Sequence, residues 1–383
     1  MKILHTIGGF GLKSGGTSTC TYDLIKNISQ ERYNTDVLTP SVKDDLDKII
    51  GEGEEWIKIV ENDCITPFAY SKNIKKYLRN NYYDIYHTNG MWLYCNHITC
   101  KIAQKTNKPY IITPHGMLYP QALKRSKWKK MTMLKLFFNN DIKNATCIHA
   151  TCLQEMRHIR DFGYKGDIAV IPNPANLPKY IHEIANNKIT HIKNNIKTFG
   201  FLGRLHPRKN VESLIYAVNK INNKDIKIII IGKGDIEYEQ FLRDEVKRLK
   251  LEKIVEFKGF LNGREKFEEL SKLTCLCVPS EFENFGMIVT EALSVRTPVI
   301  ANLGTPWEEL NIHNCGWWID CSIDNIATTM NKIINMSNNN IINMGENAEK
   351  LVYNKYNPQI IAEQMQTLYS YIINGGDKPK FIY

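Results

Sequence analysis

The chain has 383 residues, of which 50 are Lys or Arg and 40 are Asp or Glu, so its net charge is +10 at pH 7. At ~100–200 residues per domain this length indicates two domains or one large one, and 43% hydrophobic residues exclude a mainly disordered chain. No apolar run approaches the ~18 residues that a membrane span needs, and residues 1–10 lack the apolar core of a signal peptide. The ten cysteines include no CxxC pair. We therefore expect a cytoplasmic protein without a zinc site or a disulfide framework.

The first half of the chain alternates short apolar stretches with helix-like ones. Strands are predicted within residues 1–7, 33–40, 82–90, 109–116, 145–153 and 167–174. A first helix is expected near residues 19–29, with Thr17 or Thr19 as its N-cap. This alternation predicts a parallel, doubly wound sheet.

A polar stretch from Pro172 to about Ile196 is interpreted as a linker or domain edge, and the same alternation then resumes. Strands are predicted within residues 198–205, 227–234, 252–261, 274–280 and 298–304, with helices at 211–221, 237–251 and 288–295. A last amphipathic helix is expected near residues 358–373. The sequence therefore predicts two α/β domains, at residues 1–175 and 176–356.

Three predicted strand ends carry turns with Gly or His. Ligands of open α/β sheets bind at such ends. Gly15 and Gly16 precede a helix, so a phosphate or sugar could approach the backbone there, although a plain tight turn has the same pattern. His115, in Thr-Pro-His-Gly, could reach a ligand or merely cap its strand. Gly232 could admit a nucleotide or serve as an ordinary turn residue.

A fourth turn, residues 203–210, concentrates positive charge. It contains Arg204, Arg208 and Lys209, which suit a diphosphate because Arg offers a planar fork and Lys a point charge. A solvated basic loop is the alternative. No P-loop pattern occurs in the sequence, which disfavours a P-loop enzyme.

The fifth turn carries two glutamates eight residues apart, Glu283 and Glu291, around a helix expected to begin near Phe285. At ~100° per residue the two carboxylates fall within a quarter turn of each other. Carboxylates accept hydrogen bonds from hydroxyls, so the pair suits a polyol such as a hexose and a ribose. The free N–H groups of Gly286, Met287 and Ile288 would face an anionic bridge between them. Two ordinary acids at a helix start would give the same spacing.

Arg204 and Lys209, followed by Glu283 and Glu291 in EFENFGMIVTEAL, resemble the donor-binding signature of retaining GT-B glycosyltransferases of family 4 (group 1). The resemblance runs from Gly15-Gly16 to the last helix. It implies two Rossmann-like domains facing a cleft, with residues 357–383 packing back on the first domain. One departure is Gly304-Thr305-Pro306-Trp307, where the family often has Gly-Gly and then Glu. This variant is similar to members of bacterial surface-polysaccharide assembly, of O-antigen or capsule type.

The resemblance also implies roles for individual residues. Arg204 and Lys209 would bind the donor diphosphate, Glu283 the transferred hexose, and Glu291 the ribose. The remaining predicted contacts are Gly15, Gly16, Gly232, the backbone of residues 285–288, and His115 at the reacting centre. The expected reaction moves a hexose or N-acetylhexosamine with retention to a glycan or lipid-diphosphate-linked glycan. It would need no metal or other cofactor, because cations and a helix N-terminus stabilise the leaving diphosphate.

Residues 118–145 contain seven basic residues and one acid, and they supply most of the surplus charge of the first half. Trp128 stands among cations, and apolar residues follow it, so this stretch could contact an anionic membrane surface or form an ordinary solvated helix. Three other readings remain: a nucleotide-sugar 2-epimerase of the same fold, a basic nucleic-acid-binding protein, and an inactive sugar-binding scaffold. The epimerase would lack the Arg/Lys turn with the two glutamates, and no nucleic-acid-binding module is present.

Overall fold

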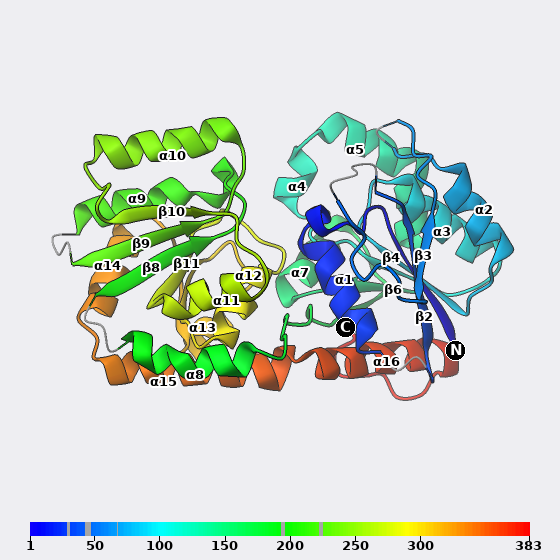
Figure 1. Cartoon of the computed structure of the whole chain (residues 1–383). Coiled ribbons are helices and arrows are strands. Elements are labelled where there is room, and N and C mark those ends of the chain that lie inside the picture. The colour runs from blue at the N-terminus through cyan, green and yellow to red at the C-terminus, as the bar shows by residue number, and fades with distance from the viewer. Residues whose placement is uncertain (29–30, 43–46, 67, 193–195, 222–224) are drawn as a thin grey trace. The chain divides into compact units, whose positions relative to one another are not determined.

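The computed structural model describes residues 1–383 except 29–30, 43–46, 67, 193–195 and 222–224. Contacts divide the described residues into two compact units, one formed by 1–174 with 358–383 and the other by 175–357. Each unit contains one parallel sheet between two layers of helices (Figure 1).

The first unit contains a seven-stranded sheet in the order β3-β2-β1-β4-β5-β6-β7. Its strands are β1 (Lys2–Ile7), β2 (Asn34–Pro40), β3 (Ile57–Val60), β4 (Ile85–Asn89), β5 (Tyr110–Thr113), β6 (Cys147–Ala150) and β7 (Asp167–Val170). Its helices are α1 (Gly16–Lys26), α2 (Lys72–Asn80), α3 (Tyr94–Lys105), α4 (Pro120–Lys124), α5 (Lys127–Met133), the π-helical η2 (Leu134–Phe138), α6 (Asn139–Lys143), α7 (Leu153–Phe162) and α16 (Pro358–Asn374), with a short 3-10 turn η1 (Leu12–Ser14).

The second unit contains a six-stranded sheet in the order β10-β9-β8-β11-β12-β13. Its strands are β8 (Lys197–Leu202), β9 (Ile226–Ile231), β10 (Val255–Gly259), β11 (Cys275–Val278), β12 (Val299–Asn302) and β13 (Gly316–Ile319). Its helices are α8 (Ile181–Ile192), α9 (Val211–Lys220), α10 (Ile236–Arg248), α11 (Gly263–Lys272), α12 (Met287–Ser294), α13 (Glu309–Ile312), α14 (Ile323–Ile334), α15 (Asn338–Leu351) and the π-helical η4 (Val352–Tyr356), with a 3-10 turn η3 (Pro207–Lys209).

The alternation of side chains along β11 explains its apolar sequence. Cys275 and Cys277 pack into the core shared with α9, α10 and α14, whereas Leu276 and Val278 pack into the core shared with α8, α11, α12 and α15. A strand buried on both faces must be apolar throughout. The two cysteines are free and buried, so they serve as small core side chains.

Both sheets are doubly wound, as the sequence predicted, and of the thirteen strands among the described residues eleven coincide with the predicted stretches to within one residue. The edge strands β3 and β13 were missed because each has only four residues, three of which are partly or fully exposed, so neither gives the continuous buried run of a central strand. The expected irregular linker contains the helix α8. Its Ile181, Ile184, Ala185 and Lys188 are buried at helical spacing, with the Lys188 stem in the place of an apolar residue.

The order of strands reverses between β1 and β4 in the first sheet and between β8 and β11 in the second. Ligands of doubly wound sheets bind at the carboxyl ends of the strands that flank such a reversal. In the second unit these ends lead into residues 203–210 and 279–286, which contain five of the predicted site residues: Arg204, Lys209, Glu283, Phe285 and Gly286.

The last helix, α16, belongs to the first unit and buries Ile361, Met365 and Leu368 against the face that α1 also covers. Its Tyr369 lies in a buried chain of hydrogen bonds that crosses four strands. The bonds run Asn89 Nδ2 to His5 Nδ1 (3.1 Å), His5 Nε2 to Tyr369 OH (2.7 Å), Tyr369 OH to His87 Nδ1 (3.0 Å), His87 Nε2 to Thr113 Oγ1 (2.6 Å), Thr113 Oγ1 to His149 Nδ1 (2.9 Å) and His149 Nε2 to the Ile171 carbonyl (2.7 Å).

The carbonyl at the end of this chain fixes the direction of every bond. Because the Ile171 carbonyl can only accept, Nε2 of His149 carries a proton and its Nδ1 accepts from the Thr113 hydroxyl. The Thr113 hydroxyl then accepts from Nε2 of His87, and Nδ1 of His87 accepts from the Tyr369 hydroxyl. That hydroxyl accepts from Nε2 of His5, and Nδ1 of His5 accepts from the Asn89 amide. Each histidine therefore has one donating and one accepting nitrogen and is neutral. Burial agrees with this, because it lowers the pKa of His5 to about 3 and of His149 to about 4, and that of His87 well below its usual value.

Candidate functional site

The predicted phosphate-binding and sugar-binding residues Lys209 and Glu283 contact each other. Lys209 ends the η3 turn after β8, and Glu283 lies in the loop after β11, so the strand reversal brings them together across 74 residues of sequence. The Lys209 ammonium donates to Oε1 of Glu283, and only 13% and 11% of the two side chains are exposed. A pair this sheltered keeps both charges in place with little screening by salt.

Arg204 takes a different partner. Its guanidinium donates to Oδ1 of Asp235 at 2.8 Å, and Nε2 of His206 lies 3.8 Å from the other oxygen of this carboxylate. Asp235 follows the Gly-Lys-Gly turn after β9, so residues from two neighbouring strand ends hold the guanidinium. The structure therefore places the two predicted diphosphate-binding cations in two separate ion pairs.

Glu291 lies inside α12 and pairs with Lys266 of α11, whose ammonium is 2.7 Å from Oε1. Helix α12 begins at Met287 rather than near Phe285, so Glu283 is outside it. Glu283 was expected just before the first turn of this helix, and because the helix begins two residues later it lies in the preceding loop, where helical spacing does not set its direction. The positions of the two glutamates depend instead on the loop that precedes the helix and on a different lysine for each.

A buried tryptophan hydrogen-bonds to the loop before α12. The indole of Trp307 donates a 2.6 Å hydrogen bond to the Phe285 carbonyl, and its ring packs against Phe285 and Tyr356. Gly286 caps the helix with φ 80°, a backbone conformation that favours glycine. The Trp307 side chain is 0% exposed and belongs to the core.

Gly232 is required by the protein's own backbone. A Cβ atom there would lie 1.8 Å from the Gly203 carbonyl oxygen, so the turns after β8 and β9 can approach each other only with glycine at this position. The Gly232 N–H donates to the Gly259 carbonyl at 2.7 Å. Packing thus accounts for this glycine, whatever ligand lies nearby.

Gly15 and Gly16 lie at the start of α1, after β1. Gly15 is the N-cap, with φ 87°, and a Cβ atom there would meet nothing within 4 Å. The expected cap, Thr17 or Thr19, is wrong, because the helix starts at Gly16 and both threonines lie within its first turn. Positive φ and open space are the features that allow a ligand to approach a helix N-terminus.

His115 adopts φ 51° in the turn after β5. Its Nε2 atom is buried and finds no hydrogen-bond partner among the residues that the structure describes. Burial lowers the pKa of this imidazole to about 3, so the ring is neutral. The next residue, Gly116, donates its N–H to the buried carboxylate of Glu155 at 2.5 Å, which holds the turn in place.

The basic stretch at residues 118–145 forms α4, α5, η2 and α6. Trp128 is 87% exposed, and Met131 and Leu136 are also exposed, whereas Leu134 and Phe138 are buried in the core. Lys130 turns inward and donates to the Ala122 carbonyl at 2.5 Å, so it is not one of the outward cations. The stretch therefore carries apolar side chains in the core and also, among its cations, on its solvent face.

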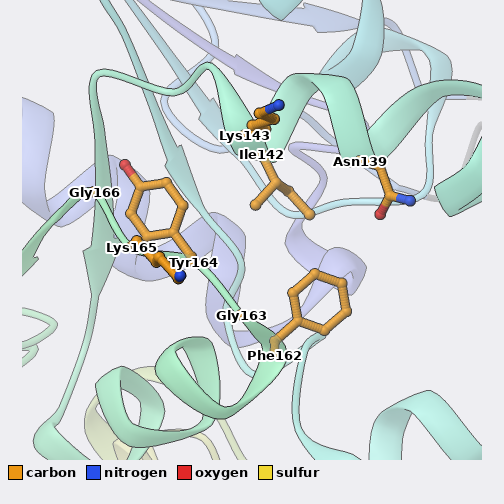
Figure 2. Close-up of a pocket in the computed structure, with 8 residues that line it drawn as sticks. All are labelled: Asn139, Ile142, Lys143, Phe162, Gly163, Tyr164, Lys165 and Gly166. Carbon is orange, nitrogen blue, oxygen red and sulfur yellow. The ribbon is translucent and has the colours of Figure 1, made fainter.

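The first unit contains a cavity of about 420 Å³, whose lining residues are drawn in Figure 2. Its lining comes from α6 and from the turn between α7 and the start of β7, including Phe162 and Tyr164. None of the residues predicted to bind the donor lines it.

The sequence did not predict that Lys266 pairs with Glu291 or that Asp235 pairs with Arg204. Neither Lys266 nor Asp235 has a recognisable motif, and Lys266 lies 25 residues from Glu291 in sequence. Among the described residues, no group of three or more His, Cys, Asp and Glu side chains could hold a metal ion. In the same part of the chain, no helix combines the length and the apolar character needed to cross a bilayer.

Comparisons with known protein families identify the chain. The family model of group 1 glycosyl transferases matches residues 183–356, and that of glycosyltransferase family 4 matches residues 14–178. The chain therefore belongs to the GT-B glycosyltransferases, and its two Rossmann-like domains are those of that fold, as the sequence predicted.

Curated relatives match parts of the chain. An uncharacterized glycosyltransferase of Methanocaldococcus jannaschii is 30% identical over 46% of this chain and 46% of its own length. The alpha-monoglucosyldiacylglycerol synthase of Streptococcus pneumoniae is 22% identical over 76% of this chain and 68% of its own. Two further relatives, from Sulfolobus islandicus rod-shaped virus 1 and from the cps region of Klebsiella pneumoniae, are matched over 57% and 63% of their lengths.

Solved structures share the whole fold. Anabaena HepE, crystallised with UDP and glucose, has a TM-score of 0.74 and 19% identity, over 97% of this chain and 99% of that one. Sucrose-phosphate synthase from Thermosynechococcus elongatus has a TM-score of 0.77 and 19% identity, over 98% and 100%. At such identities the likeness concerns the fold alone.

Proposed function

We propose that this protein transfers a hexose or N-acetylhexosamine, with retention, from a nucleoside diphosphate sugar to a saccharide acceptor. The acceptor would be linked to a lipid diphosphate, and the product would serve surface-polysaccharide assembly of the O-antigen or capsule type. The contact between Lys209 and Glu283 carries this proposal, because it puts a phosphate-binding cation against a hydroxyl-binding carboxylate at the strand reversal of the second sheet.

The donor diphosphate would compete for the cations that now hold carboxylates. The ammonium of Lys209 would move to a phosphate oxygen, which would free Glu283 to accept hydrogen bonds from the hydroxyls of the sugar. Arg204, held by Asp235, would provide a second positive charge, and Glu291, held by Lys266, would accept from the ribose. The HepE crystal structures with UDP and UDP-glucose support this class of donor.

In the proposed reaction, the bond between the anomeric carbon and the diphosphate oxygen breaks, and an acceptor oxygen bonds to that carbon from the same face. The acceptor proton passes to a phosphate oxygen of the leaving nucleoside diphosphate. Negative charge grows on that diphosphate, so Arg204, Lys209 and the N–H groups at the start of α12 would stabilise the transition state more than the ground state. We propose that no metal ion is needed, because these groups supply the positive charge.

His115 would act on the sugar. Its neutral imidazole has a buried Nε2 without a partner among the described residues, and a sugar hydroxyl would satisfy it. Gly15 and Gly16 would let the acceptor and the diphosphate approach the N-terminus of α1.

The basic stretch would lie on the inner face of an anionic membrane. Exposed Trp128, Met131 and Leu136 would enter the interface while exposed cations such as Lys127 and Lys129 face lipid headgroups. The similarity to the streptococcal alpha-monoglucosyldiacylglycerol synthase supports a lipid-linked acceptor.

A thermal-shift panel of UDP-, GDP- and ADP-sugars tests the donor class, since a ligand that binds only the folded protein raises the apparent melting temperature. We expect one nucleotide series to stabilise the protein and a Lys209→Met variant to lose that shift. Proton NMR of the product would then show the anomeric configuration, and an inverted product would exclude the retaining mechanism. Unchanged turnover with EDTA is expected, and loss of turnover restored by a divalent cation would contradict the metal-free mechanism.

A further inference from the structure

A groove of about 600 Å³ lies between α2 and α3 of the first unit. It follows α3 for its 12 residues, or about 18 Å. Its volume is within the ~300–1,000 Å³ of small-molecule sites. None of the residues proposed above to bind the donor lines it.

The floor of this groove is apolar. Leu78, Ile98 and Ile102 are almost fully buried and form its base, and Tyr94 continues the base toward one end. At that end the rings of Phe68 and Phe137 stack at 5.2 Å. The groove therefore offers a continuous hydrocarbon and aromatic surface along two helices.

The walls are cationic on both sides. Lys75 and Arg79 project from α2, and Lys101 and Lys105 project from α3, each pair one helical turn apart. None of these four makes a side-chain hydrogen bond or ion pair with any residue that the structure describes. Arg79 and Lys105 lie in the last turns of their helices, where the helix dipole favours a cation. Lys75 and Lys101 lie nearer the middle, so the dipole does not explain them.

The sequences of these helices leave the four cations without an acidic neighbour on their own helix. Neither α2 nor α3 contains a single Asp or Glu. On α10, in contrast, Arg243 pairs with Glu239 and Arg248 pairs with Glu245. Cations that face each other across a groove with no carboxylate in its lining repel, so they favour an anionic ligand between them. The buried carboxylate of Asp141, which lies behind the lining at 2.7 Å from His97, offsets part of this charge near Lys101.

The lining also discriminates between anionic ligands. Among the described residues that line the groove there is no Asp, Glu, Asn or Gln. The groove therefore lacks the carboxylate and amide acceptors that suit the many hydroxyls of a glycan, and the acceptors in its described lining are hydroxyls and one imidazole, from Tyr70, Tyr82, Tyr94, Thr106 and His97. An apolar floor with cationic walls instead fits a hydrocarbon chain that carries a phosphate.

We propose that this groove binds one anionic phospholipid, with a hydrocarbon chain on the floor and its phosphate between the cations of α2 and α3. The lipid comes from the surface of a membrane. This site is separate from the donor site and does not depend on the proposed glycosyl transfer.

Isothermal titration calorimetry with dihexanoyl phosphatidylglycerol, kept below its aggregation concentration, tests the proposal on the full chain. We expect saturable binding with one lipid per chain. Dihexanoyl phosphatidylcholine, with equal chains and no net charge, and glycerol 3-phosphate, with the charge and no chain, should each bind at least ten-fold more weakly. Equal binding of either compound, or no saturable binding of the anionic lipid, would overturn the proposal.

Helix α2 offers a matched pair of variants. Lys75→Gln with Arg79→Gln removes two cations from the groove, and Lys72→Gln with Lys76→Gln removes two from the same helix outside it. Both double variants lower the net charge by two. We expect the first to weaken lipid binding at least ten-fold and the second to leave it within two-fold. Equal weakening would mean that the lipid responds only to overall charge, and tighter binding of an acidic oligosaccharide than of the lipid would assign the groove to a glycan.

A nucleotide thermal shift measured on the same proteins separates this proposal from the proposed function. Both double variants should retain the wild-type shift with the donor nucleotide, because none of the four residues lies in the second unit. Loss of lipid binding with a normal nucleotide shift therefore concerns the groove alone.

Discussion

The indole Nε1 of Trp307 donates a 2.6 Å hydrogen bond to the carbonyl oxygen of Phe285, directly before the glycine that caps α12. This bond fixes the backbone from which the helix presents its N–H groups. Trp307 is fully buried, so a core side chain supports this loop.

We therefore expect Trp307→Phe to raise the KM for the donor several-fold and to lower kcat less. The ring packing is retained, but the buried Phe285 carbonyl loses its donor, at a cost of about 1–3 kcal/mol in the free energy of unfolding. Steady-state kinetics and urea unfolding measure the two effects. Trp317→Phe is the control, and an equal rise in KM for both variants would contradict a specific role of the Phe285 bond.

The chain of buried histidines makes the stability of the first unit sensitive to acid. The folded pKa values of His5 and His149 lie at about 3 and about 4, below the ~6.5 of an unfolded histidine. The unfolded state therefore binds more protons as the pH falls through 6.5, and each such histidine removes up to ~1.4 kcal/mol per pH unit until its folded pKa is reached. Hydrogen exchange of the β1 and β4 amides at pH 7 and pH 5 should show this loss. Equal protection at both values would contradict neutral, buried histidines.

Tyr369→Phe tests the link between α16 and the first sheet. The substitution leaves the ring in place but removes the hydroxyl that accepts from His5 and donates to His87. We expect a loss of about 1–3 kcal/mol of stability, because two buried ring nitrogens lose their partner. Tyr371→Phe, on the same helix and half-exposed, is the control. No difference between the two variants in exchange of the β1 amides would show that the hydroxyl is dispensable.

Lys266→Met should weaken binding of the donor nucleotide about ten-fold and leave kcat at saturation within a few-fold. The substitution removes the cation that holds the carboxylate of Glu291, so the acceptor for the ribose loses its fixed orientation. Titration calorimetry with the nucleoside diphosphate measures the change. Lys272→Met, which breaks an exposed pair with Glu269 on the same helix, should leave affinity unchanged. A ten-fold loss in the Lys272 variant would contradict the assignment.

Trp128→Ala with Leu136→Ala should reduce sedimentation with vesicles rich in phosphatidylglycerol several-fold. Both side chains are exposed, so the double variant should melt at the wild-type temperature. Binding of the wild type should also weaken as salt is raised, because headgroup attraction is screened. Equal sedimentation with neutral vesicles would contradict an anionic membrane surface.

Much of the fold was readable from the sequence because parallel strands that are buried on both faces give continuous apolar runs. Residues 228–231 and 275–278 are clear examples. The edge strands β3 and β13, and the helix α8 with its buried Lys188, were missed because tertiary contacts rather than local pattern decide them.

The sequence predicted which residues belong to the site but not which of them pair with each other. The turn of Arg204 and Lys209 and the two glutamates were recognisable in the sequence, but their pairing depends on the order of strands. Only the reversal between β8 and β11 brings Lys209 to Glu283, and only the approach of α11 brings Lys266 to Glu291. The inward turn of Trp307 was also hidden, since an aromatic residue in a loop gives no sign of the face it presents.

The central claim is that Lys209 and Glu283 act on the donor. Measuring transfer by the Lys209→Met and Glu283→Gln variants, with the donor chosen by the thermal-shift panel, tests it most directly. We predict that kcat falls ~10²–10³-fold in both variants, as when a group that stabilises developing charge is lost, while hydrogen exchange shows that both remain folded. Lys220→Met, which breaks an exposed pair with Asp324, should keep wild-type turnover. Near-normal turnover in both the Lys209 and the Glu283 variants would contradict the assignment of the site.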